Sequence, residues 1–205
     1  MKENNEVVQN IEQIRSIMDR SSRFMFLSGW SGVIAGSFSI AAILWAEKVL
    51  KELARPESGL NALEMVVYYH SILLLALVVF SVSGIISVYL AYRNARQQGR
   101  NAFSFTGKRM AMNFLLPIVF GGLFCVCMLP SARELIPATM MMFYGIALLH
   151  SSKYSESDLY GLGIVMCLLG LGAAAIGHNK EFMITGFGVL HILFGLYMHY
   201  GGKKS

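Results

Sequence analysis

The sequence predicts an all-α integral membrane protein: a bundle of six transmembrane helices preceded by an amphipathic helix, with both termini in the cytoplasm. Three observations lead to this fold class. The 205-residue chain is 55% hydrophobic and only 14% charged, which makes it far more apolar than a soluble domain. Its apolar residues fall into six segments, each long enough to cross a bilayer core. Its basic residues concentrate in alternate connections between these segments.

The N-terminal segment, residues 1–23, is expected to form the amphipathic helix. Val7, Ile11 and Ile14 follow helical spacing, and charged side chains fill much of the remaining surface. Helices of this kind lie on a membrane surface or dock to a partner. Residues 5–23 are therefore one predicted contact surface for anionic lipid or for a cytoplasmic protein.

The transmembrane domain is predicted at residues 24–200, followed by a basic tail at 201–205. Its six spans are expected at about residues 24–46, 62–92, 110–130, 135–151, 159–178 and 182–200. Apart from Glu64 in the first turn of the second span, every Lys, Arg, Asp and Glu lies outside them. Coupled transporters commonly place carboxylates at the membrane core, so this distribution disfavours coupled transport.

The orientation follows from the positive-inside bias. With six spans, the N-terminus, the second and fourth loops and the C-terminus share one side, which holds 12 Lys and Arg residues against 5 on the other. The second loop, residues 93–109, is basic and contains no acid. It is the second predicted contact surface for anionic lipid or a protein partner. Loop orientation also accounts for the net charge of +5, so no nucleic-acid partner is expected.

Small residues recur at helical spacing in three spans, as in helices that pack closely inside a bilayer. They are Gly29, Gly32, Gly36 and Ser39 in the first span, Gly163, Cys167, Gly170, Ala174 and Gly177 in the fifth, and Gly188 and Gly195 in the sixth. The fifth and sixth spans are joined by a very short connection, so their faces are expected to pack on each other. Alternatively, these small-residue faces pack between copies of the chain in a homo-oligomer.

The histidines are the leading candidates for chemistry. In the predicted orientation His70 and His178 lie toward the outer face, and His150 and His199 toward the cytoplasmic face. Two pairs at matched depths on different helices are what a b-type haem protein with two axial histidines requires. We favour the competing interpretation, four interfacial side chains with an apolar body and a polar tip. No cofactor is therefore expected, and haem b is the alternative.

His191 lies near the midplane of the sixth span, between Gly188 and Gly195. A polar ring at this depth is a functional hypothesis by default, for ligand binding or for helix packing. We favour a helix-to-helix hydrogen bond, because no acid, cysteine cluster or second ligand accompanies the ring and no metal site is predicted. In the alternative of a facilitator for a small neutral solute, Asn113 of the third span and His191 would line the path.

Three stretches resemble an uncharacterised family of small bacterial integral membrane proteins. They are IRSIMDRSSRFMFLSGWSGVIAG (residues 14–36), FYGIALL (143–149) and GFGVLHILFG (186–195). The resemblance implies a multi-pass protein of a bacterial inner membrane and brings no activity, cofactor or catalytic residue. No soluble-enzyme motif is found either. The sequence thus favours a non-enzymatic binding, sensing or scaffolding module, with the haem protein and the facilitator as alternatives.

Overall fold

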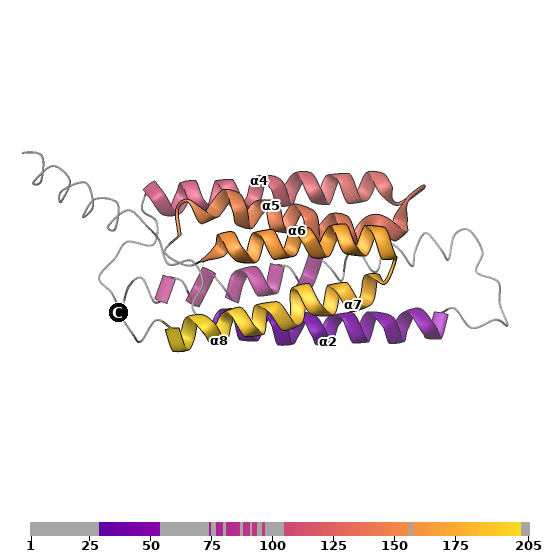
Figure 1. Ribbon diagram of the computed structural model, residues 1–205, viewed down its shortest axis with the longest axis horizontal. Coiled ribbons are helices and arrows are strands. Elements are labelled where there is room, and N and C mark those ends of the chain that lie inside the picture. Colours follow the sequence, from indigo (N-terminus) through magenta and orange to yellow (C-terminus); the bar gives the residue numbers. More distant parts are fainter. Residues whose placement is uncertain are drawn as a thin grey trace, which may run out of the picture.

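Figure 1 shows the computed structural model, an elongated bundle whose helices run side by side along its length. The structure describes residues 29–53, 74, 77–79, 81–86, 88–90, 92–93, 96, 105–155 and 158–201. The predicted amphipathic helix, His70, most of the second span and the last four residues lie outside the described residues, as does most of the basic loop at 93–109.

Every regular element of the described residues is helical. In chain order these elements are α2 (Gly29–Leu53), α4 (Phe105–Met128), the short 3-10 helix η1 (Arg133–Leu135), α5 (Ile136–Ser152), α6 (Leu159–Ile176), α7 (Asn179–Met183), the π-helix η2 (Ile184–Leu190) and α8 (His191–Gly201). The described pieces of residues 77–96 are helical as well. The all-α prediction is confirmed for the part of the chain that the structure describes.

Five helices are long and apolar enough to cross a membrane. They comprise Gly29–Lys48, Thr106–Met128, Arg133–Ser152, Leu159–Ile176 and Asn179–Tyr200, and they match the first, third, fourth, fifth and sixth predicted spans. A shorter apolar helix, Leu77–Leu90, falls in the second predicted span, of which only parts are described. By length and composition the chain is consistent with a membrane protein.

Local sequence explains where the helices of the second half begin and end. Pro137 lies in the first turn of α5, where its missing N–H costs little. The side chain of Asp158 caps α6 by accepting a hydrogen bond from the backbone N–H of Gly161, at 3.4 Å. α6 ends at Gly177, whose φ of +80° is a left-handed conformation that glycine adopts without a side-chain clash. The chain reverses there, and α7 begins at Asn179.

The helices form two groups. α4, α5 and α6 lie side by side, and α8 lies along α2 on the other side of the bundle (Figure 1). α2, α4 and α6 run in one direction, and α5 and α8 return. One end of the bundle, here called the terminal end, therefore holds the starts of α2, α4 and α6 and the ends of α5 and α8. The opposite, far end holds η1 and α7.

The outside of the bundle is apolar. Large hydrophobic side chains are exposed along the long helices, among them Ile34 and Phe38 of α2, Leu116 and Phe120 of α4, and Leu168 and Leu171 of α6. The fully buried side chains include three methionines, Met110, Met141 and Met166, together with Leu148 and Leu159. Continuous exposed apolar surface of this extent is unfavourable in water and favourable against acyl chains, which supports the membrane interpretation.

The first close contact between helices, here called the α5–α6 seam, is made by Gly145 of α5 and by Gly163 and Gly170 of α6. A Cβ added to Gly163 would lie 2.9 Å from the carbonyl oxygen of Gly145, and one added to Gly170 would lie 2.9 Å from that of Ala138. Only glycine allows backbones to approach this closely. Two helices that are consecutive in the chain thus share a glycine-lined contact.

This seam corrects one prediction from the sequence. The small-residue face of the fifth span was expected to pack on the sixth, yet its Gly163 and Gly170 face α5, and Ala174 and Gly177 are exposed. A short connection makes two helices antiparallel neighbours but does not fix which face each presents. α6 meets the following helix with another face, where Gly172 lies against the ring of Phe182.

The second close contact, here called the α2–α8 seam, joins Gly29, Gly32 and Gly36 of α2 to Gly188 of η2 and Gly195 of α8. Added Cβ atoms at Gly29 and Gly36 would each lie 2.6 Å from a carbonyl oxygen, that of Gly195 and that of Gly188 respectively. The glycine faces predicted for the first and the sixth spans therefore pack on each other. Helices about 160 residues apart in the chain are brought together by them.

Candidate functional site

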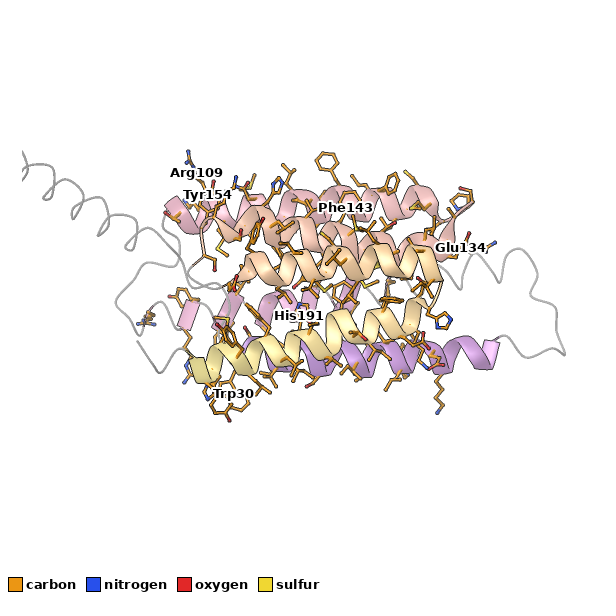
Figure 2. All side chains as sticks on the ribbon, viewed as in Figure 1. Trp30, Arg109, Glu134, Phe143, Tyr154 and His191 are labelled. Carbon is orange, nitrogen blue, oxygen red and sulfur yellow. The ribbon has the colours of Figure 1, made fainter. Side chains whose placement is uncertain are left out.

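The polar residue at the centre of the bundle is His191. It is the first residue of α8, directly after the π-helix η2, and its side chain is only 5% exposed. Figure 2 shows it midway along the bundle, far from Trp30 and Glu134 at the two ends. A ring at this depth has no water to bond with, so its two nitrogens require partners within the protein.

Both ring nitrogens of His191 have such partners. Nδ1 lies 2.8 Å from the carbonyl oxygen of Gly186, and Nε2 lies 2.7 Å from the hydroxyl oxygen of Tyr144 on α5. A carbonyl oxygen can only accept, so Nδ1 carries the proton. In the neutral ring Nε2 is then an acceptor, and the Tyr144 hydroxyl donates to it. The arrangement holds His191 as the neutral Nδ1–H tautomer.

Aromatic rings surround this pair. The ring of Tyr144 meets those of Phe114 on α4 and Phe187 in η2 at centroid distances of 5.9 and 5.3 Å, both nearly edge to face. The ring of Phe187 is also stacked on that of His191, at 6.2 Å. Edge-to-face and offset stacked geometries are the favourable ones for aromatic pairs. The hydrogen-bonded pair is therefore held in an apolar frame contributed by two elements, α4 and η2.

The π-helix determines where the His191 ring lies. η2 contains Gly186 and Gly188, both buried, and its i→i+5 hydrogen bonding makes a wider turn than an α-helix. The carbonyl of Gly186 faces the ring of the residue five positions later. π-segments inside helices occur frequently at functional sites. Here the irregular turn lets one helix present its backbone to α2 and the ring of His191 to α5.

The four histidines of the haem alternative are placed as follows. His150 is exposed on α5, and His178 is exposed at the start of α7. The ring of His199 on α8 meets that of Trp30 on α2 edge to face, with centroids 5.5 Å apart. The ring of His199 thus contacts α2, and its pairing with His150 as haem ligands stays a prediction. His70, the predicted partner of His178, lies outside the described residues.

Asn113 bonds within its own helix, and its place beside His191 along a solute path stays a prediction. Its side-chain amide donates to the carbonyl oxygen of Arg109, one turn earlier in α4, at 2.8 Å. Polar side chains in membrane helices often bond to their own helix in this way. Gly188 and Gly195 contribute to the α2–α8 seam. Within the described part of the chain, no group of three or more His, Cys, Asp or Glu side chains is placed to hold a metal ion.

Tyr144, the principal partner of His191, was not identified from the sequence. Other tyrosines of this chain lie at the ends of spans, where an interfacial position explains them. Tyr144 instead lies in the middle of the fourth span, beside Gly145. A hydroxyl at mid-depth needs a partner, and His191 is at the same depth in the sixth span, so depth alone could have suggested the pair.

The two ends of the bundle differ in charge. Among the described residues, the terminal end carries Arg93, Arg96, Lys108, Arg109 and Lys153, with Asp158 as its acid. The far end carries Lys48, Arg133 and Lys180, balanced by Glu47, Glu134 and Glu181. Lys180 Nζ and Glu47 Oε2 form an ion pair at 2.7 Å. The terminal end is therefore basic, and the far end is close to neutral.

No protein-family model matches this chain, and neither the curated proteins nor the solved structures that were compared with it gave a match. The function is therefore inferred from the geometry of the site and from the distribution of charge.

The His191–Tyr144 pair can act chemically as a hydrogen-bonded link between two helices. Each hydrogen-bonding atom of the His191 ring is engaged, one within its own helix and one across to α5. Because the ring donates to a carbonyl and accepts from a hydroxyl, no charged group is needed to satisfy it. Such an arrangement fixes the sixth span relative to the fourth and leaves the ring without a free nitrogen for a ligand.

Proposed function

We propose that this chain is a six-span protein of a bacterial inner membrane, with both termini in the cytoplasm, which acts as a non-enzymatic binding or scaffolding module. The contact surface is the basic terminal end of the bundle. The observation that carries the proposal is the unequal distribution of charge between the two ends. Cytoplasmic loops of membrane proteins carry the excess of Lys and Arg, and this bias sets their orientation.

Aromatic side chains support the same assignment of the terminal end to a membrane interface. Exposed tryptophan and tyrosine side chains gather there, near the start or end of the spans: Trp30, Tyr92, Tyr160, Tyr197 and Tyr200. Rings of this kind favour the headgroup level, where the apolar body and the polar tip are both solvated. The central His191–Tyr144 pair supports a scaffolding role, because it serves to fix helices relative to each other.

Cysteine labelling tests the orientation. In a Cys127→Ser background, Lys153→Cys reports on the terminal end and Glu181→Cys on the far end. A membrane-impermeant maleimide added to cells with a permeabilised outer membrane should label the second position and not the first. After disruption of the inner membrane both should react. Labelling of Lys153→Cys in intact inner membranes would overturn the orientation.

Photo-crosslinking in living cells tests the contact surface. A photoreactive amino acid at Arg96 or Lys153 should give discrete protein or lipid adducts, whereas the same group at Lys48 or Glu181 should not. Adducts of equal abundance from the two ends would contradict a contact surface at the terminal end. Deleting residues 1–20 should leave the bundle inserted and reduce adduct formation, if the N-terminal segment contributes to binding.

A further inference from the structure

Cationic groups of two neighbouring helices lie at the terminal end of the bundle. Lys108 and Arg109 lie in the first turns of α4, and Lys153 directly follows α5; all three are exposed. His150 is exposed one turn before Lys153 and offers a ring nitrogen on the same face of α5.

These groups lie at a common depth. The ring of Phe114 on α4 contacts that of Tyr144 on α5, which aligns the two helices. Arg109 precedes Phe114 by five residues and His150 follows Tyr144 by six, which places both about 8 Å toward the terminal end at 1.5 Å per residue. Figure 2 shows Arg109 and Tyr154, the neighbour of Lys153, at this end. Lys108, Arg109 and Lys153, with His150 beside Lys153 in sequence, therefore lie at the same depth of two neighbouring helices. They are here called the α4–α5 cationic cluster.

An exposed apolar stripe continues directly from this cluster along α4. Met112, Leu115 and Val119 follow Lys108 at four, seven and eleven residues, so they share its helical face. Their side chains are 65%, 47% and 56% exposed. The surface thus changes from cationic to apolar within one turn of α4. A ligand that fits it has an anionic group attached to a long apolar one.

We infer that the α4–α5 cationic cluster binds the phosphate of an anionic phospholipid whose acyl chains lie along Met112, Leu115 and Val119. The first turn of α4 contains no acid, so the partial positive charge of the helix start adds to that of the side chains. Free phosphate has no apolar group that could cover Met112, Leu115 and Val119. The exposed apolar stripe therefore favours a phospholipid over free phosphate.

The inference deepens the proposed function by naming the chemistry of one partner of the terminal end. It can be tested on purified protein without reference to orientation in the cell. A failed lipid test therefore leaves the labelling result intact, and a failed labelling result leaves the lipid site intact.

Thermal unfolding in a neutral detergent measures binding. Phosphatidylglycerol should raise the melting temperature in a saturable manner, and phosphatidylcholine with the same acyl chains should have a much smaller effect. In Lys108→Gln/Arg109→Gln the apparent affinity for phosphatidylglycerol should fall about 30-fold, because each cation near an anionic lipid surface contributes a factor of about five. Lys48→Gln, which removes an exposed cation from the far end, should retain the wild-type affinity.

Three outcomes would overturn the inference. The first is equal stabilisation by the two lipids, and the second is an unchanged affinity in the double variant. The third is stabilisation by inorganic phosphate alone at the same concentration, which would show a free-anion site. If the double variant does not fold in phosphatidylcholine as the wild type does, Lys153→Gln takes its place, with an expected loss of about fivefold.

Discussion

The α5–α6 seam and the α2–α8 seam both depend on glycine, but their contacts differ. In the α5–α6 seam the glycines meet side chains as well as backbone: Leu149 faces Gly163, and Met142 faces Gly170. In the α2–α8 seam Gly36 and Gly188 also meet isoleucine side chains, but Gly195 has only backbone atoms of α2 as its three nearest neighbours. The difference between the seams therefore lies at Gly195. A side chain can change rotamer to relieve a clash, whereas a backbone atom moves only with its helix.

The two seams also differ in what they position. α5 and α6 are consecutive in the chain, so their contact organises one hairpin. The α2–α8 seam closes the bundle by joining its first and last described long helices. In addition, the carbonyl of His191 lies against Gly32 of α2, while its ring bonds to Tyr144 of α5. The last span thus links the two groups of helices, through its backbone on one side and through a side chain on the other.

The largest effect is expected at the α2–α8 seam. In Gly195→Ala the new Cβ would lie 2.5 Å from the carbonyl oxygen of Gly29, so α2 and α8 must separate. The free energy of unfolding should fall by about 3 kcal/mol, the upper part of the range for overpacked contacts. Reversible unfolding in mixed micelles measures it. Gly122→Ala is the matched control, since its Cβ would meet nothing within 4 Å, and it should cost no stability.

A smaller effect is expected at the α5–α6 seam. In Gly170→Ala the new Cβ would lie 2.9 Å from Met142 Cγ and from the carbonyl oxygen of Ala138. The approach is less close than the 2.5 Å at Gly195, and one of the nearest atoms belongs to a methionine side chain that can rearrange. The loss should therefore be about 1–2 kcal/mol in the same unfolding assay. A loss as large as that of Gly195→Ala would show that the two seams respond alike, and the distinction between movable and fixed neighbours would be wrong.

The comparison also shows what the sequence could predict. Helical spacing of Gly29, Gly32 and Gly36 identified a packing face, because a face depends only on residues of one helix. It did not identify the helix on the other side. The same limit explains the error at Gly163 and Gly170, because a short loop does not fix which face each helix presents. The choice of partner helix depends on how well two surfaces that are far apart in the chain fit each other. The spacing of residues within one helix carries no information about that fit.

The site follows the same division. His191 was found from the sequence, since a polar ring at mid-depth of an apolar span is visible in the composition of that span alone. Tyr144 was missed because its role depends on a second helix. The π-helix is not predicted either, because Gly186 and Gly188 favour irregular backbone without specifying an i→i+5 turn.

Removing the hydroxyl of Tyr144 tests the side-chain link between the two groups of helices. Tyr144→Phe keeps the aromatic contacts with Phe114 and Phe187 but leaves His191 Nε2 without its donor. Hydrogen bonds between membrane helices contribute about 0.6 kcal/mol on average, so the free energy of unfolding should fall by roughly that amount. A double-mutant cycle with His191→Leu isolates the pair. Tyr160→Phe, at an exposed side chain, is the control and should have no effect.

A coupling energy of zero in that cycle would show that the hydrogen bond does not hold α8 against α5. The backbone contacts of Gly195 and Gly188 would then be sufficient to position the last span.

The smallest effect is expected at the far end of the α2–α8 seam, where Lys180 of α7 pairs with Glu47 of α2. Both side chains are partly exposed, at 40% and 25%, so water and salt screen their attraction. Lys180→Gln should lower the melting temperature only slightly at low salt, and the difference should vanish at high salt. If this variant instead lost more stability than Gly195→Ala, the ion pair rather than the glycine contacts would hold α2 against the last span. The close glycine contacts of the α2–α8 seam would then result from the ion pair and would not themselves hold the two helices together.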